Sequence, residues 1–90
     1  MSDVTRIVEV THNRGLHARA SAKFVTLAAT LPVSVQVEKD GSRVCGTSIM
    51  GLMMLGAAKG DTIVISAAGD GAEAAVDALT ALVEARFNEE

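Results

Sequence analysis

The amino-acid sequence predicts an α+β fold in which one β-sheet is covered on one face by helices. Segments with the two-residue alternation of strands and segments with helical spacing follow one another in the order strand, helix, strand, strand, helix, strand, helix. The chain has 90 residues and contains no internal repeat, low-complexity stretch or linker. Residues 1–90 are therefore expected to form a single domain around one core.

Four strands are expected from runs of β-branched residues and from the alternation of apolar with polar positions. They cover Val4 to Val10, Val33 to Glu38, Arg43 to Gly46 and Thr62 to Ala67. The dipeptide Asp40-Gly41 separates the second run from the third and is typical of a tight hairpin turn.

Two longer helices are expected from apolar residues that recur on one face. The first begins at Ala18, stops at Pro32 and has the apolar face Ala20, Phe24, Leu27, Ala28 and Leu31. The last has the apolar face Ala72, Ala75, Val76, Leu79, Leu82, Val83 and Phe87. Its outward positions are expected to be Glu73, Asp77, Thr80 and Glu84.

A short helix is expected between the third and fourth strands. Thr47 or Ser48 can cap its first turn through a hydroxyl, and Gly56 suits the left-handed position after its end near Leu55. Leu52 and Leu55 are expected to face the core. Three further apolar residues have no evident place inside: Ile49, Met50 and Met53. They either form an adaptable binding surface or fill gaps in a core that is poor in aromatics, and the residues alone favour neither.

Composition excludes several classes of function. The net charge is −3, the basic residues are scattered, and the only aromatic side chains are two phenylalanines; nucleic-acid binding needs a concentrated cationic surface or stacking platforms. The one cysteine, Cys45, cannot form an internal disulfide and is expected to be a small core residue in a reducing compartment. No signal peptide or run of about 20 apolar residues is present, so a cytoplasmic protein is expected.

The sequence also lacks the usual marks of an enzyme. It has no Gly-rich phosphate loop of the Walker type and no GxGxxG fingerprint. His12, His17 and Cys45 do not have the spacing of a zinc site. We therefore expect no enzyme active site, no metal and no cofactor.

The most informative segment is Gly15-Leu16-His17-Ala18-Arg19, because His17 lies where a loop ends and a helix begins. The first N–H groups of a helix lack intrahelical partners and stabilise an anion. A phosphoryl group on His17 could accept hydrogen bonds from the N–H groups of Ala18 and Arg19, and the Arg19 side chain could add a charge-assisted one. The alternative is a histidine that merely starts a helix. His12 is expected to be solvated, with no role.

Two segments together resemble the HPr family, the histidine phosphocarriers of the bacterial phosphotransferase system. The stretch from His12 to Val25, with Gly-Leu-His-Ala-Arg inside it, looks like the family's active-site signature. The stretch Thr47 to Leu55, with Ser-Ile-Met-Gly inside it, looks like its regulatory serine segment. Length and element order also agree, so the resemblance covers the whole chain.

The resemblance implies an open-faced β-sandwich, a four-stranded antiparallel sheet covered on one face by three helices in the order βαββαβα. It implies a monomeric carrier, not an enzyme, whose His17 accepts phosphate on Nδ1 from enzyme I and passes it to an EIIA-type protein. Arg19 matches the arginine that steadies the phosphoryl group, and Ser48 matches the serine modified by HPr kinase/phosphorylase. The apolar docking surface is matched by Ile49, Met50 and Met53.

One position departs from the pattern, because many members have proline after the arginine where this chain has Ala20. Alanine still permits the helix to start there. The branch stays open: Leu52 to Gly60 and the acidic tail Phe87 to Glu90 resemble nitrogen-related carriers, whereas Ser-Ile-Met-Gly resembles kinase-regulated sugar-uptake carriers. Two rival functions are a regulatory binding module without phosphohistidine and a small ligand-binding α+β domain.

Overall fold

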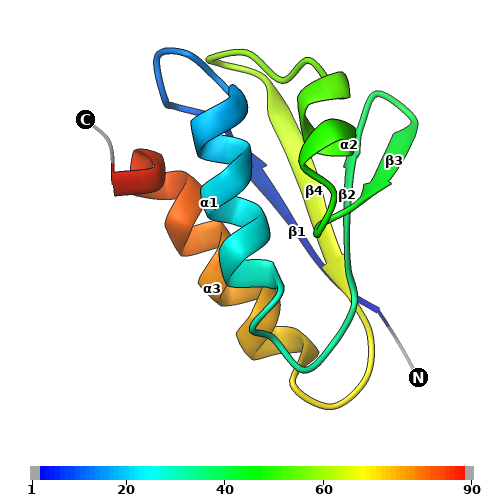
Figure 1. The fold of residues 1–90 in the computed structure, drawn as a ribbon. Helices are drawn as coiled ribbons and strands as arrows, with labels where there is room; N and C mark the ends of the chain where they lie inside the picture. The colour runs from blue at the N-terminus through cyan, green and yellow to red at the C-terminus, as the bar shows by residue number, and fades with distance from the viewer. Residues whose placement is uncertain (1–2, 89–90) are drawn as a thin grey trace.

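The computed structural model describes residues 3–88 and contains one four-stranded antiparallel sheet with three α-helices on one side (Figure 1). The strands are β1 (Val4–Glu9), β2 (Val35–Lys39), β3 (Ser42–Cys45) and β4 (Thr62–Ala67). The helices are α1 (Ala18–Ala28), α2 (Ile49–Met54) and α3 (Ala72–Glu84), followed by the 3₁₀ turn η1 (Arg86–Asn88). The predicted βαββαβα fold is confirmed; Glu89 and Glu90 of the acidic tail lie outside the described residues.

The sheet has the strand order β1-β4-β2-β3, so that β4 pairs with a neighbour on each side. The β2–β3 hairpin turns at Asp40 (φ 51°) and Gly41 (φ 85°), as the Asp-Gly dipeptide predicted. Positive φ at both central residues gives a turn whose twist matches that of the strands. The short strand β3 is therefore at the edge of the sheet, and α2 lies against it.

The core lies between the sheet and the helices and is almost entirely aliphatic. The sheet contributes buried valines and isoleucines, which pack against apolar side chains of all three helices. Phe24 of α1 and Phe87 of η1, the two aromatic residues of the chain, are both fully buried. Every helix therefore buries one face against the same side of the sheet, which leaves the other side of the sheet uncovered.

The first connection differs from its prediction, because α1 ends at Ala28 rather than beside Pro32. Thr30 and Leu31 donate their N–H groups to carbonyls only three residues back, the tighter pattern that ends many helices. Residues 29–34 form an irregular link, so that β2 begins at Val35 instead of Val33.

Two predictions at the last helix are wrong. Thr80 is buried, because it lies one turn after the fully buried Val76 on the same stripe of the helix. Phe87 does not extend the apolar face of α3, which ends at Glu84. It reaches the core through three successive residues with left-handed backbone, Arg86, Phe87 and Asn88 (φ 55°, 55° and 59°).

The loop before α1 packs tightly against the loop before β4. The Leu16 N–H donates to the Ala57 carbonyl at 2.9 Å, and the buried Leu16 side chain joins the core. Gly15 has a φ of +63°, and a Cβ atom there would lie 2.3 Å from the Ala57 oxygen. This backbone approach therefore requires glycine for its conformation and for its lack of a side chain.

We expect Gly15→Ala to destabilise the fold far more than Gly56→Ala. The two glycines have nearly the same φ (+63° and +66°), but a Cβ at Gly56 would have no neighbour within 4 Å. Gly56→Ala should cost only the left-handed strain of about 1–2 kcal/mol. Gly15→Ala must also displace backbone and should cost about 3 kcal/mol or more, which corresponds to roughly 12–24 °C in melting temperature. Equal urea midpoints for the two variants would contradict the close approach.

Candidate functional site

His17 is the N-cap residue of α1, with extended backbone (φ −74°, ψ 179°). Its Nδ1 atom accepts a hydrogen bond from the Arg19 N–H at 3.1 Å, and its carbonyl accepts the Ser21 N–H at 2.8 Å. Because Nδ1 accepts, it carries a lone pair and not a proton. The arrangement thus holds an unprotonated imidazole nitrogen at the positive end of an 11-residue helix.

Ala18 and Arg19, whose N–H groups are predicted to hold an anion, begin the first turn of α1. Ala18 and Arg19 are both exposed, so the end of the helix faces solvent. The Arg19 N–H already donates a hydrogen bond to the Nδ1 atom of His17. This bond was not predicted from the sequence. Beside them, Lys59 donates to the Asn13 side-chain oxygen at 2.9 Å and so joins the two loops that flank the helix start.

His12 lies beneath His17 and is not solvated as predicted, since only 4% of its surface is exposed. Its Nδ1 accepts the Arg14 N–H at 3.1 Å, and its carbonyl accepts the Gly15 N–H at 3.0 Å. The turn therefore folds around the imidazole. The ring centroid lies 4.9 Å from that of His17.

Phe87, which lies far from His12 along the sequence, packs against the His12 ring. Its ring meets the His12 ring edge-on, with centroids 5.9 Å apart at 65°. The Lys23 ammonium of α1 donates to the Phe87 carbonyl at 2.9 Å. The contact between Phe87 and His12 was not predicted from the sequence, because the left-handed turn that carries Phe87 has no periodic pattern. The available signal was that Phe87 is one of only two phenylalanines in the chain.

Ser48 is the N-cap of α2. Of the two residues predicted as possible caps, Thr47 and Ser48, the second therefore has this role. Its Oγ accepts the Gly51 N–H at 2.9 Å, and its carbonyl accepts the Leu52 N–H at 3.0 Å. Its backbone is extended (φ −108°, ψ 108°). Ser48 and His17 therefore have the same structural role at the starts of two helices.

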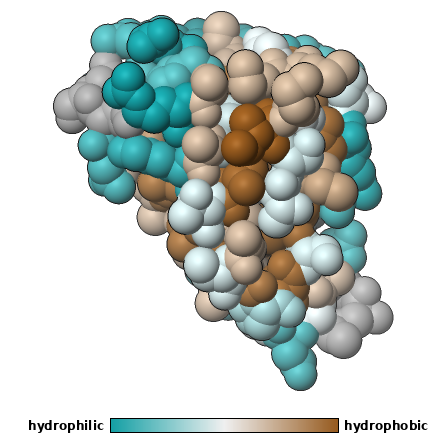
Figure 2. Space-filling view, viewed as in Figure 1, coloured by the Kyte–Doolittle hydropathy of each residue, from teal (hydrophilic) through white to brown (hydrophobic). Residues whose placement is uncertain are grey.

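The predicted apolar residues of α2 lie on its outer side, whereas Leu52 and Leu55 are buried as expected. The exposed fractions are 40% for Ile49, 70% for Met50, 42% for Met53 and 79% for Met54, the last of which the sequence reasoning missed. Figure 2 shows hydrophobic atoms gathered over α2 and beside α1, with hydrophilic atoms over the loop before α1. We call these four side chains the α2 surface; their exposure shows that they do not fill gaps in the core.

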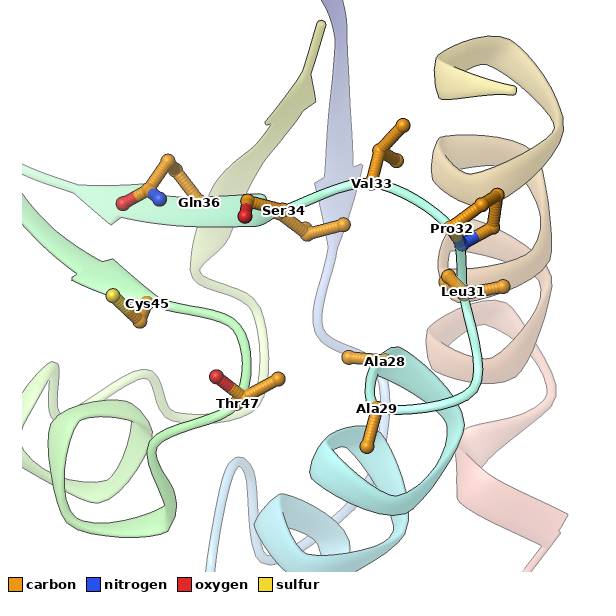
Figure 3. Close-up of a pocket in the computed structure, with 10 residues that line it drawn as sticks. Ala28, Ala29, Leu31, Pro32, Val33, Ser34, Gln36, Cys45 and Thr47 are labelled. Carbon is orange, nitrogen blue, oxygen red and sulfur yellow. The ribbon is translucent and has the colours of Figure 1, made fainter. Parts of the chain in front are cut away.

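A cavity of about 330 Å³ opens at the opposite end of α1 from His17, about 15 Å along the helix axis (Figure 3). Ala28 and Ala29 line one side, and Gln36, Cys45 and Thr47 line another. None of the ten lining residues is charged, so the cavity offers no group that would bind phosphate by charge.

Cys45 was predicted to be a core residue, and this is wrong, because it is exposed. It belongs to the edge strand β3, where Val44 contacts α2 and the next side chain points to the opposite face.

Among residues 3–88, no three His, Cys, Asp or Glu side chains are grouped so that they could hold a metal ion. None of the helices in that range is long and apolar enough to cross a bilayer.

Comparisons with known proteins show the family to which the chain belongs. The family described as "PTS HPr component phosphorylation site" matches residues 4–85. The phosphocarrier protein HPr of Neisseria meningitidis is 48% identical over 82 residues, covering 91% of this chain and 92% of the relative. The phosphocarrier protein NPr of Shewanella violacea is 36% identical over 89 residues, covering 99% and 98%. A crystal structure of HPr from Thermoanaerobacter tengcongensis superposes with a TM-score of 0.88 at 43% identity, covering 100% and 99%. The chain belongs to the HPr family.

Proposed function

We propose that this chain is a phosphocarrier of the phosphoenolpyruvate-dependent phosphotransferase system. His17 accepts a phosphoryl group from enzyme I and passes it to an EIIA-type protein, in sugar uptake or in nitrogen-related regulation. The observation that carries the proposal is the unprotonated Nδ1 of His17 at the exposed start of α1, 3.1 Å from the Arg19 N–H. Membership of a family of phosphocarriers supports it.

The Nδ1 lone pair of His17 attacks the phosphorus held by enzyme I. The new N–P bond forms as the bond from phosphorus to enzyme I breaks, and the electron pair of that bond stays with enzyme I. Phosphorylation uses up the lone pair that accepts the Arg19 N–H, so this N–H becomes available to a phosphoryl oxygen. The positive end of α1, together with the Ala18 N–H and the Arg19 side chain, stabilises the added negative charge.

The start of α1 is exposed to solvent, so we propose that transfer depends on partners that bring their own groups. We propose that the α2 surface docks enzyme I and the EIIA-type protein. Four large apolar side chains exposed on one short helix form the kind of patch that marks an interface, and methionines adapt to partners of different shape. In this proposal the carrier acts as a monomer in the cytoplasm, without a cofactor.

The rival function, a regulatory binding module without phosphohistidine, would use the α2 surface but not His17. It gives no reason for an imidazole nitrogen held at a helix start. Incubation with enzyme I and phosphoenolpyruvate separates the two, because only a carrier gains a phosphoryl group.

His17→Asn should abolish phosphorylation and leave the fold stable. Asparagine can still cap α1 through its side-chain oxygen, whereas His17→Ala loses the cap and about 1 kcal/mol of stability. The wild type should form an acid-labile, base-stable phosphohistidine with enzyme I and phosphoenolpyruvate, detected by mass spectrometry. Undiminished phosphorylation of His17→Asn would remove His17 from the role of acceptor.

Arg19→Ala should slow transfer to the EIIA-type protein without unfolding the chain, because the Arg19 side chain is exposed. A charge-assisted contact contributes about 1.5–3 kcal/mol, so the slowing should be roughly 10- to 150-fold if the whole contact acts on the barrier. Arg19→Lys should rescue the rate only in part, since lysine lacks the planar fork. Wild-type transfer rates in rapid-quench measurements on Arg19→Ala would refute this role.

Met53→Asp should weaken docking of enzyme I at least tenfold, because a charge must then be buried at an apolar interface. The melting temperature should hardly change, since this side chain is 42% exposed. Ile7→Asp is the matched control: Ile7 is 71% exposed but belongs to β1, away from α2. Titration calorimetry with enzyme I should separate the two variants, and equal weakening by both would argue against docking through α2.

We propose Ser48 as a second, inhibitory phosphorylation site for a kinase such as HPr kinase/phosphorylase. Ser48→Asp should stay folded, because aspartate caps a helix well, and should accept phosphate from enzyme I more slowly because its charge lies beside the α2 surface. Ser48→Asn keeps the cap without the charge and should react at the wild-type rate. If Ser48→Asp also reacts at the wild-type rate, Ser48 is only a helix cap.

A further inference from the structure

We propose that His12 is a positioning residue that holds the imidazole of His17 in the orientation required for phosphoryl transfer. The inference rests on the proposed function, in which His17 is the acceptor. It concerns a side chain that has no part in the chemistry described above. His12 is nearly as buried as the aliphatic core although it lies in a loop.

The first observation is the contact between the two imidazole rings. Their centroids are 4.9 Å apart and their planes are inclined at 52°, within the range in which aromatic rings attract each other. His12 therefore packs against the ring whose Nδ1 must stay near the Arg19 N–H. A side chain without a ring at this position would leave His17 with a smaller contact and more freedom to rotate.

The second observation is that His12 is itself held from two directions. Its Nδ1 accepts the Arg14 N–H, so its neutral ring carries the proton on Nε2 and cannot turn over without losing that bond. On another side it meets the edge of Phe87. Phe87 is held in turn by the bond from the Lys23 ammonium to its carbonyl. Because His12 is held in this way, its ring can restrain the ring of His17.

The third observation excludes His12 as a second acceptor. Only 4% of the residue surface is exposed, whereas His17 is half-buried at an exposed helix start. A partner protein cannot bring a phosphoryl group to it. Its influence on the reaction must therefore pass through His17, by keeping the reacting nitrogen where attack is productive.

Two substitutions distinguish the effect of the His12 ring from the effect of its Nδ1 atom as a hydrogen-bond acceptor. His12→Phe keeps a ring against His17 and loses the acceptor for the Arg14 N–H. His12→Asn keeps an acceptor, because asparagine forms the same kind of side-chain turn, and loses the ring. If the ring positions His17, the rate of phosphorylation by enzyme I should fall about 2- to 12-fold in His12→Asn, the range for loss of an aromatic pair. The rate should fall clearly less in His12→Phe, which keeps the ring against His17 and Phe87 and loses only the bond from the Arg14 N–H.

A spectroscopic readout tests the same point without any partner. The ¹⁵N chemical shifts of the His17 ring, measured where the imidazole is neutral, report which nitrogen carries the proton. The wild type should show an unprotonated Nδ1. His12→Asn should move toward a mixture of the two tautomers, and His12→Phe should not. Val76→Ala, which truncates a fully buried residue of α3, should lower the melting temperature while leaving the His17 spectrum and rate unchanged.

The outcomes are distinct for the two proposals. A wild-type chain that takes no phosphoryl group from enzyme I defeats the proposed function, yet the His17 spectrum still decides whether His12 fixes that ring. An unchanged spectrum and rate in His12→Asn would overturn the positioning role and leave His12 as a structural residue of the turn. Equal slowing by His12→Asn and His12→Phe would also overturn it, because the loop hydrogen bond and not the ring would then matter.

Discussion

The contact between the backbone of Gly15 and that of Ala57 is the constraint on which the site depends. It brings the loop before α1 against the loop before β4, and the hydrogen bond from the Leu16 N–H to the Ala57 carbonyl fixes the distance. The next residue, His17, must then begin the helix, so its side chain can reach back to the first turn. A side chain at Gly15 would force these two backbones apart. The position of the imidazole is therefore set by packing between two loops and not by the helix alone.

Local patterns sufficed to predict the elements that surround this contact. The Asp40-Gly41 turn, the strand Thr62–Ala67 and the start of α1 at Ala18 each depend on a few neighbouring residues, and the structure has all three. The burial of His12 could not be predicted in the same way. It depends on Phe87, which arrives from the far end of the chain through a left-handed turn. Long-range contacts of polar residues leave no periodic signal in one sequence.

The exposed side of α2 follows from the small size of the fold. A six-residue helix that packs on a one-sided sheet buries few residues, and here these are Leu52 within α2 and Leu55 at its C-cap. The remaining large apolar side chains stay in water. Burying a side chain of this size is worth about 1.5–3 kcal/mol, so a partner that covers the α2 surface recovers free energy that folding leaves unused. An apolar surface of this kind costs little stability and gives affinity only where shape fits.

The two residues proposed to carry phosphate share one structural device. His17 and Ser48 are N-caps, and in each the atom proposed for modification is the atom that accepts an N–H from the first turn, Nδ1 from Arg19 and Oγ from Gly51. A phosphoryl group on either atom weakens or removes that acceptor and supplies oxygens that can accept the same N–H. The helix start is thus stabilised before and after modification, first by a neutral cap and then by an anion at its positive end. In the proposed function, this device would let a chain of 90 residues with one small core change its charge at His17 and at Ser48 and keep its fold.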